Sequence, residues 1–182
     1  MNLCRKPIYT LVLLYVLMPF KGFGQQQDVK ARSGAELKNA AKEIILSSSS
    51  CTLITLDQEG RPRARIMDAF LPDQDFNIWF GTNPKSRKVK QITTDNRVTL
   101  FYKDHDDSGY VMICGSAEIV NDPEEKEKHW KEEWAPFYEN RQDGFVLIKV
   151  SPDWMEVVSN TRGILGDPVT WEAERVDFDP VK

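Results

Sequence analysis

The sequence predicts a mainly β domain whose antiparallel strands close into a barrel. At least five strand-like segments follow one another in hairpin succession, and only short helices lie between them. Sequential strands joined by tight turns pair antiparallel, whereas a parallel sheet needs a crossover helix between its strands. Closure into a barrel would also remove exposed strand edges.

The first 24 residues are expected to be a secretory signal peptide. Arg5 and Lys6 precede an uncharged apolar run at residues 8–20, which is shorter than the ~20 residues of a transmembrane helix. Cleavage is expected before Gln25, and retention of the segment as an N-terminal anchor is the alternative. The chain is therefore expected to be exported, to the periplasm or outside the cell, without a stable membrane partner after cleavage.

Charge and composition exclude several classes of function. The net charge is −4, and the expected signal peptide carries cations but no acids, so the mature chain is more acidic still. An acidic domain is not expected to bind nucleic acid. His105 and His129 lie in charged stretches without any Cys-x-x-Cys spacing nearby, so they are expected at the surface and no metal site is predicted.

Cys51 and Cys114 remain after signal cleavage. Export would permit a disulfide between them. Both lie in apolar, strand-like surroundings, so free buried thiols are the favoured reading.

The domain is expected over residues 34–160, after a flexible linker at residues 25–33 and before an irregular C-terminal extension at residues 161–182. Ser33 is a helix cap, and the apolar residues that follow recur on one helical face. These residues are Leu37, Ala40, Ala41, Ile44 and Ile45.

Runs rich in β-branched and aromatic residues, bounded by turn residues, predict the strands. The expected strands are residues 51–56, 61–71, 76–80, 98–103, 110–120 and 145–158, with a further short strand at 176–178. A second helix is expected at residues 84–94. A third, charged helix opens at Asp122 and carries Trp130, Trp134, Phe137 and Tyr138 at spacings that would pack on one side.

The stretch at residues 79–92, WFGTNPKSRKVKQI, has the character of a phosphate site. A strand ends here and a basic helix begins, with Thr82 or Asn83 as its cap and Pro84 at its first position. Ser86, Arg87 and Lys88 would bring a hydroxyl and two cations to the positive end of the helix dipole. The alternative is an ordinary capped helix with a solvated basic face.

Arg61, Arg63 and Arg65 alternate along the second strand, so their side chains should share one face of the sheet. Three guanidinium groups in a row repel one another unless something negative faces them. One interpretation is an exposed basic face screened by solvent. The other, which we favour, is that Arg65 contacts the same phosphate as Thr82, Ser86 and Lys88.

Four segments together resemble the FMN-binding split-barrel family of the pyridoxamine 5'-phosphate oxidases and related general stress proteins. They are Arg65-Ile-Met, WFGTNPKSRKVKQI, NRVTLFY and VMICGSAEIV, within a similarity that spans residues 36–158. The resemblance implies an antiparallel split barrel and a homodimer with FMN at its interface.

The resemblance also implies roles for individual residues. Arg65 and Lys88 would bind the FMN phosphate, Ser86 and Arg87 would support it, and Thr82 would contact the cofactor. Ile66 and Met67 would lie along the isoalloxazine. Tyr110 stands where the oxidases commonly place a glutamine from the second subunit, which makes it a candidate flavin contact. Trp154 is either an interface residue or, as we favour, a core tryptophan.

Two departures bear on the substrate. Phe70 occupies the position at which the oxidases carry a lysine for the substrate phosphate, and their C-terminal Arg-x-His motif is missing. Oxidation of vitamin B6 phosphates is therefore not expected, and the closer resemblance is to the general stress branch.

Three functions are consistent with the sequence. The first is an FMN-dependent oxidoreductase acting on a small molecule, with the flavin as the redox group and no catalytic side chain assigned. The second is a non-catalytic module that holds FMN, deazaflavin or haem. The third, which the retained phosphate-site residues disfavour, is a barrel that has lost its cofactor.

Overall fold

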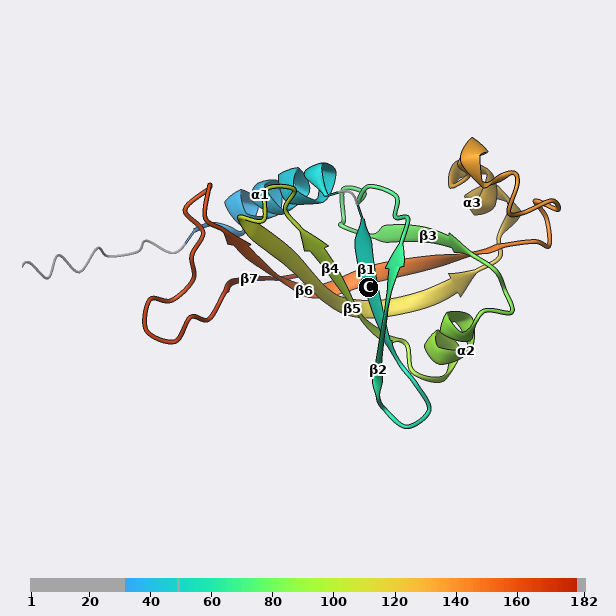
Figure 1. Cartoon of the computed structure of the whole chain (residues 1–182), viewed down its shortest axis with the longest axis horizontal. Helices are drawn as coiled ribbons and strands as arrows, with labels where there is room; N and C mark the ends of the chain where they lie inside the picture. Colours follow the sequence, from blue (N-terminus) through green and yellow to red (C-terminus); the bar gives the residue numbers. More distant parts are fainter. Residues whose placement is uncertain (1–31, 49, 180–182) are drawn as a thin grey trace, which may run out of the picture. The chain divides into compact units, whose positions relative to one another are not determined.

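The computed structural model describes residues 32–48 and 50–179 (Figure 1). The expected signal peptide and most of the expected linker lie outside them. In chain order the elements are α1 (Gly34–Ser47), β1 (Cys51–Leu56), β2 (Pro62–Met67), β3 (Ile78–Thr82), α2 (Arg87–Thr94), β4 (Arg97–Lys103), β5 (Gly109–Val120), α3 (Pro123–Lys128), the 3-10 turn η1 (Glu132–Trp134), β6 (Val146–Ser159) and β7 (Glu174–Asp177). The predicted mainly β class is confirmed.

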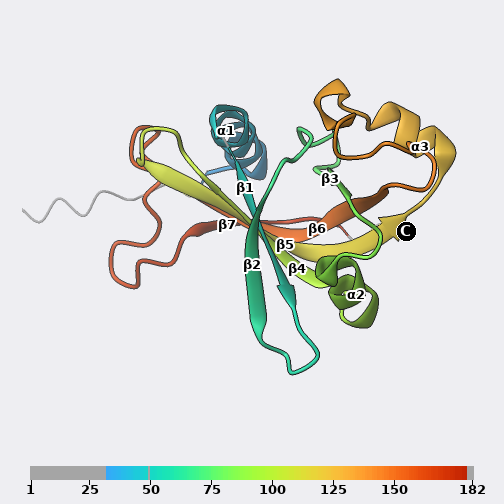
Figure 2. The same ribbon diagram turned by 45° about the vertical axis from the view of Figure 1, so that its right-hand side comes forward.

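All strand pairs in the seven-stranded sheet are antiparallel, in the order β2-β1-β4-β5-β6-β3, with β7 added to β6. The β1–β2 and β4–β5 hairpins come from neighbouring segments, and β5 and β6 form the longest ladder (Figure 2). β7 lies within the expected C-terminal extension, so part of that extension is paired with the sheet.

The two ends of this strand order are joined by a narrow seam. Ala69, just after β2, forms an isolated bridge with Phe80 of β3, and the Phe70 N–H donates to the Trp79 carbonyl at 2.9 Å. This short contact closes the sheet on itself, so the barrel is complete but only thinly paired along this line.

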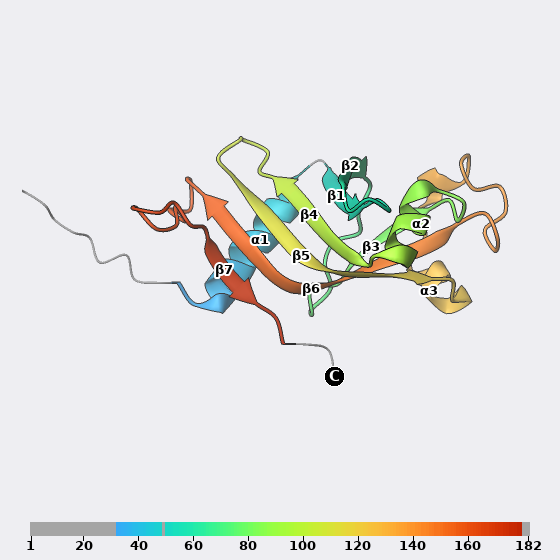
Figure 3. The ribbon, with the colours of Figure 1, turned by 90° about the horizontal axis from the view of Figure 1, so that it is seen from below.

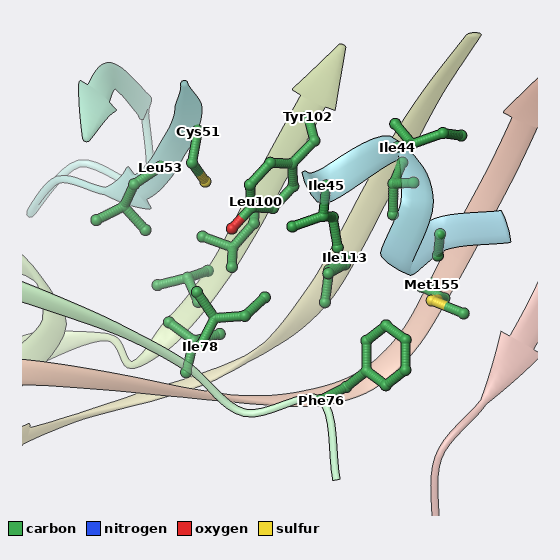
Figure 4. Packing of buried hydrophobic residues seen from close by; sticks show 14 of the residues in the cluster. Ile44, Ile45, Cys51, Leu53, Phe76, Ile78, Leu100, Tyr102, Ile113 and Met155 are labelled. Atoms are coloured by element: carbon green, nitrogen blue, oxygen red, sulfur yellow. The ribbon is translucent and has the colours of Figure 1, made fainter. Parts of the chain in front are cut away.

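Helix α1 begins and packs as its sequence predicts. Ser33 accepts a hydrogen bond from the Glu36 N–H at 3.3 Å, and the Glu36 carboxylate accepts one from the Ser33 N–H at 2.8 Å. The helix lies across β4, β5 and β6 (Figure 3). Its five predicted apolar residues are all buried. Ile44 and Ile45 point toward Ile113 in the core (Figure 4).

A buried carboxylate fixes the far end of α1. Asp104, at the end of β4, is 1 % exposed and accepts hydrogen bonds from the Ser47 hydroxyl at 2.9 Å and from Arg162 Nη1 at 2.8 Å. Burial by itself would raise the pKa of the Asp104 carboxyl, but the hydrogen bonds from Ser47, Arg162 and His105 outweigh it and lower the pKa to about 2. One side chain thus connects α1, the β4–β5 loop and the segment after β6.

Asp104→Asn is therefore expected to lower the free energy of unfolding by about 2 kcal/mol at neutral pH. A carboxyl whose pKa is depressed by folding stabilises the protein above its unfolded pKa, so this contribution disappears as the pH falls from about 4 to about 2. Urea unfolding at several pH values should show the difference between wild type and variant shrinking over that range. Asp106→Asn, on the exposed part of the same loop, should change little; a difference that does not vary with pH would contradict this account.

The second and third strands are shorter or shifted relative to the prediction. β2 ends at Met67 rather than residue 71, because the chain leaves the hairpin there to form the seam. β3 begins at Ile78 rather than residue 76, because Phe76 takes a positive φ of 64° in the preceding turn and fills the core from there. Asp73 holds that turn by accepting hydrogen bonds from the Asn77 main chain and side chain, both at 2.9 Å.

The prediction for the aromatic residues after Asp122 is wrong in part. Helix α3 ends at Lys128, so the four aromatic residues do not share one helical face. Trp130, Trp134 and Tyr138 pack instead around Phe145, in a small cluster separate from the main core. Phe137 is 78 % exposed.

Cys51 and Cys114 are free thiols. Cys51 is buried, as expected, whereas Cys114 on β5 is only half-buried. Within the described residues, no helix is long and apolar enough to cross a membrane.

Candidate functional site

Arg65 lies where β1, β2 and α2 meet. It is paired across the hairpin with Leu53, whose side chain is fully buried, so the guanidinium lies on the inner side of the sheet. Arg65 Nη1 donates to Thr55 Oγ1 at 2.7 Å and Nη2 donates to Gln91 Oε1 at 3.0 Å. The Thr55 hydroxyl donates to the same Gln91 oxygen at 2.7 Å. These three bonds orient Arg65 and attach α2 to the hairpin.

Lys88 is oriented by the end of β3. Its Nζ donates to Thr82 Oγ1 at 2.9 Å, and that oxygen lies 3.4 Å from Ser86 Oγ. Thr82 is buried and its place is fixed by pairing with Val146 of β6, so it belongs to β3 and does not cap the helix. Figure 2 shows α2 beside the β1–β2 hairpin, following directly on β3.

Helix α2 begins at Arg87, not at Pro84 as the sequence suggested. The Ser86 N–H donates to the Asn83 carbonyl at 3.0 Å, so residues 83–86 form a turn before the helix. Ser86 is the N-cap, but its side chain makes no capping hydrogen bond. Among the described residues, the N–H groups of Arg87 and Lys88 have no acceptor. Such free amides at a helix N-terminus favour an anion.

Arg65, Arg87 and Lys88, which we call the cation group, repel one another. Burial lowers the pKa of Arg65, and the charge of Arg87 lowers it further. Burial also lowers the pKa of Lys88, with the Arg65 charge as the second cause. In the part of the chain that the structure describes, no carboxylate forms an ion pair with any of the three. The group is therefore positively charged without internal compensation.

The other two arginines of β2 and its turn differ from Arg65. Arg63 pairs with Asp57, with Nε 2.9 Å from Oδ2, and Arg61 pairs with Glu59. Solvent-facing ion pairs thus neutralise two members of the row within their own hairpin. Only the third, Arg65, is left facing other cations, which supports the anion-binding interpretation for this residue alone.

An open hollow of about 240 Å³ lies beside the start of α2. The helix contributes Arg87, Lys90 and Gln91 to its wall, and the β1–β2 turn contributes Asp57, Gln58 and Glu59. Arg87 is the member of the cation group that lines this hollow, together with the acidic residues of the turn.

The remaining candidates lie elsewhere on the sheet. Ile66 is 74 % exposed and belongs to the outer face, the side on which Ile66, Thr52, Phe101 and Met112 are cross-strand neighbours. Tyr110 shares this face and stacks on Phe101 at 5.3 Å between ring centroids. Burial raises the pKa of the Tyr110 hydroxyl, with Glu156 as the second cause. Met67 points the opposite way and packs against the core.

Thr55 and Gln91 were missed by the sequence analysis. Each carried a signal: Thr55 alternates with the buried Leu53 along β1, and Gln91 lies one helical turn after Arg87 and Lys88. Trp154, expected in the core, is instead half-buried on the outer face, with the Arg175 guanidinium 4.4 Å from its ring centroid.

One loop has the residue types of a metal site, although none was expected. Asp104, His105 and Asp106 bring ligand atoms within 4.8 Å of one another. Asp104 already accepts the hydrogen bonds of Ser47 and Arg162, and His105 is exposed. We assign no metal to this loop.

Comparison with known proteins identifies relatives of this chain. The family described as "Pyridoxamine 5'-phosphate oxidase like" matches residues 36–170. General stress protein 26 of Bacillus subtilis is 24% identical over 123 residues, which are 65% of this chain and 85% of that protein. The pyridoxine/pyridoxamine 5'-phosphate oxidase of Shewanella frigidimarina is 34% identical over 82 residues, so the match spans 44% of this chain but only 38% of that enzyme.

A solved structure agrees with the fold. The crystal structure of general stress protein 26 from Bacillus anthracis superposes with a TM-score of 0.60 at 26% identity, covering 68% of this chain and 94% of that one. The residues that match the family, 36–170, include β1 to β6 and the whole cation group. The split barrel expected from the sequence is thereby confirmed, and the chain belongs to the pyridoxamine 5'-phosphate oxidase-like family, in its general stress protein 26 branch.

Proposed function

We propose that this chain binds FMN and acts as an FMN-dependent oxidoreductase on a small molecule. The observation that carries the proposal is the cation group, in which Arg65, Arg87 and Lys88 have no acidic partner in the described residues and lie beside two free amides. A phosphate that enters this place compensates charges that otherwise repel and accepts the free N–H groups. The chain belongs to a family that typically binds flavin, which supports FMN as the molecule that carries this phosphate.

The residues present fit such a cofactor. Arg65 offers its guanidinium in a fixed orientation, because Thr55 and Gln91 hold it, and Lys88 offers an ammonium oriented by Thr82. Bound flavin would supply the transfer of hydride or electrons. The task of this chain is then to bind, orient and shield it. Ile66 and Tyr110, on the outer face, are the side chains that we propose for contact with the ring system.

Vitamin B6 phosphates are not the proposed substrates. Phe70, at the position of the oxidases' substrate-phosphate lysine, packs edge-on against Trp134 at 5.6 Å and against His129 at 5.2 Å between ring centroids. An aromatic ring held in this way offers no charge to a phosphate.

The test is the visible spectrum of residues 25–182, as purified and after incubation with FMN followed by gel filtration. We expect flavin absorption bands to remain with the protein, and nicotinamide cofactors or dithionite to bleach them reversibly. A protein that stays colourless and shows no affinity in an FMN titration would contradict the proposal.

A non-catalytic module for FMN, deazaflavin or haem is the second candidate. Deazaflavin carries phosphate and would use the same cation group, whereas haem would not need Ser86 or Lys88. Difference spectra recorded with each ligand distinguish the three. Bound flavin that dithionite reduces but no small-molecule donor or acceptor turns over would favour the module over the enzyme.

We also propose that two copies pair through the outer face. Ile66 is exposed there, and Ile54, Phe101, Met112 and Trp154 are only half-buried, so the face leaves apolar side chains in water. A second copy would cover them and supply its own Tyr110 beside the flavin. Export by the expected signal at residues 1–24 remains part of the proposal.

Met112→Lys is expected to convert the dimer to a monomer and to weaken FMN binding. In the monomer the new ammonium stays hydrated and faces Glu156, its cross-strand neighbour, but in a dimer it would be buried. Light scattering after gel filtration measures the oligomeric state. Val169→Glu, which changes a residue that is 85 % exposed, should leave the dimer intact. A wild-type monomer that still retains FMN would refute the pairing.

A further inference from the structure

A hollow of about 500 Å³ lies at the end of the sheet where β5 leads into α3 and the chain returns to β6 (Figure 1). We call it the α3 hollow, defined by Asn121, Lys126, Arg141, Gln142, Asp143 and Phe145. Its volume is in the range of sites that receive small molecules. It shares no lining residue with the hollow beside α2, so it is distinct from the proposed phosphate site.

A buried ammonium lies at the wall of the α3 hollow. Lys126 is 6 % exposed, although lysine is rarely buried without an acidic partner. Its Nζ donates to Asn121 Oδ1 at 2.8 Å and to the Gln142 carbonyl, and it lies 4.8 Å from the ring centroid of Phe145. These three neighbours of Nζ all line the hollow, which places the ammonium beside it.

The charge of Lys126 is not neutralised within the described residues. No carboxylate there forms an ion pair with it, and its two acceptors are neutral amide oxygens. An ammonium has three N–H groups, and no acceptor in this part of the chain meets the third. Burial lowers the pKa of Lys126, and the charge of Asp143 raises it to a smaller degree. Because a buried charge without a partner is costly, an anion in the hollow would stabilise this side chain.

Arg141 brings a second cation to the α3 hollow. Its guanidinium lies 4.3 Å from the ring centroid of Trp130, and its Nη2 lies 3.0 Å from Glu127 Oε2. The side chains of Arg141 and Glu127 are 44 % and 76 % exposed, and an ion pair so open to water contributes little. Arg141 can therefore exchange Glu127 for a ligand carboxylate, which fits the two N–H groups of a guanidinium.

The rest of the wall limits the charge and the character of the ligand. Glu127 and Asp143 also line the hollow, so its two cations stand beside two carboxylates. A doubly charged phosphate would be repelled by both carboxylates more strongly than a single carboxylate group is. The side-chain NH₂ groups of Asn121 and Gln142 donate no hydrogen bond within the described residues. They are available to a carbonyl or hydroxyl oxygen of the ligand.

We propose that the α3 hollow binds a small organic acid that has one carboxylate group and a neutral hydrogen-bonding group. Lys126 and Arg141 bind the carboxylate, and the side-chain amides of Asn121 and Gln142 bind the neutral group. This site goes beyond the function proposed above and does not require flavin.

N-acetylglycine and N-acetylglycinamide are a matched pair of probes, because they differ only in the replacement of the carboxylate by a neutral amide. Saturation-transfer NMR of the wild-type protein, without added FMN, should show N-acetylglycine bound with a dissociation constant on the order of 1 mM. N-acetylglycinamide should bind at least about tenfold more weakly, since it cannot form a charge-assisted hydrogen bond as an anion. Equal binding of the two probes, no binding of N-acetylglycine, or tighter binding of inorganic phosphate in competition would overturn the proposal.

Lys126→Met and Lys128→Met are matched variants, because both lysines belong to α3 and only Lys126 lines the hollow. Lys126→Met should weaken N-acetylglycine binding about tenfold. Lys128→Met, at a side chain that is 62 % exposed, should not weaken it. Arg141→Gln changes an exposed side chain and should also weaken binding about tenfold, so the test does not depend on how well Lys126→Met folds. Equal losses in the two lysine variants, or unchanged binding in Arg141→Gln, would refute the assignment.

The cation group is the other place that can attract a carboxylate. Loss of N-acetylglycine binding in Lys88→Met, with binding retained in Lys126→Met, would place the probe there and refute the assignment. If FMN binds, a saturating concentration of it should not displace N-acetylglycine, and displacement would likewise count against the α3 hollow. If FMN does not bind but N-acetylglycine does, and Lys126→Met weakens it, the proposed function fails while the α3 site stands.

Discussion

Lys88→Met is expected to weaken FMN binding about a hundredfold while changing the stability of the free protein by no more than about 1 kcal/mol. A charge-assisted hydrogen bond to a phosphate contributes about 1.5–3 kcal/mol, and the longer-range attraction to a dianion is lost as well. In the free protein, the lost hydrogen bond to Thr82 is offset by relief of the repulsion from Arg65. Affinity and stability should therefore respond very differently to the same substitution.

The pH dependence of FMN affinity is a second test of the role of Lys88. Because the pKa of Lys88 is lowered from 10.5 in the free protein, its ammonium loses a proton at a lower pH than an ordinary lysine. FMN affinity should fall as the pH rises through that lowered pKa, and Lys88→Met should lack this step. Fluorescence titration of FMN, whose emission changes on binding, measures both effects.

Lys103→Met is the matched control for this charge. Lys103 is 64 % exposed and pairs with Asp107 on the surface, where such pairs contribute little. The Lys103→Met variant should bind FMN as tightly as the wild type does. Equal losses in the two variants would mean that overall charge, rather than the cation group, attracts the cofactor.

Gly115→Ala is expected to lower the free energy of unfolding by about 3 kcal/mol. A Cβ at this position would lie 2.1 Å from the carbonyl oxygen of Ser151 and 2.9 Å from the Cα of Pro152. These are backbone atoms of the facing strand β6, at the place where the β5–β6 register shifts between Cys114 and Gly115. The clash cannot be relieved by a side-chain rotation, so the longest ladder of the sheet has to move.

Urea unfolding followed by circular dichroism measures this loss. Gly34→Ala is the control, because a Cβ there meets only Val176 at 3.8 Å and alanine favours the helix that begins at this residue. It should be neutral or stabilising. If Gly115→Ala unfolds at the same urea concentration as the wild type, the close approach of β5 and β6 is not needed for the fold.

Local signals in the sequence were sufficient where a segment carries its own pattern. α1 has its Ser33 cap and its buried face as predicted, and β1 has the predicted bounds, because side-chain period and caps determine both. The phosphate-site residues came together for the same reason: Thr82, Ser86 and Lys88 are neighbours along the chain.

Three features that the sequence did not predict depend on tertiary contacts. The start of α2 moved because Asn83 accepts hydrogen bonds from the Ser86 N–H with its carbonyl and from the Lys85 N–H with its side chain, which closes a turn before the helix. The partner of Arg65, Gln91, is distant in sequence and is brought near only by α2 packing on β1. The assignment of Trp154 to the core failed because its strand has an outer face, and a half-buried face gives the same alternating pattern as an inner one.

The seam between Ala69 and Phe80 gives the barrel a place where it can open locally. The amides near this single bridge should exchange with deuterated solvent faster than those of the β5–β6 ladder, which is paired on both sides. The line along which the barrel closes is thus also its least protected line, and local opening of the sheet should begin there before the long ladder separates.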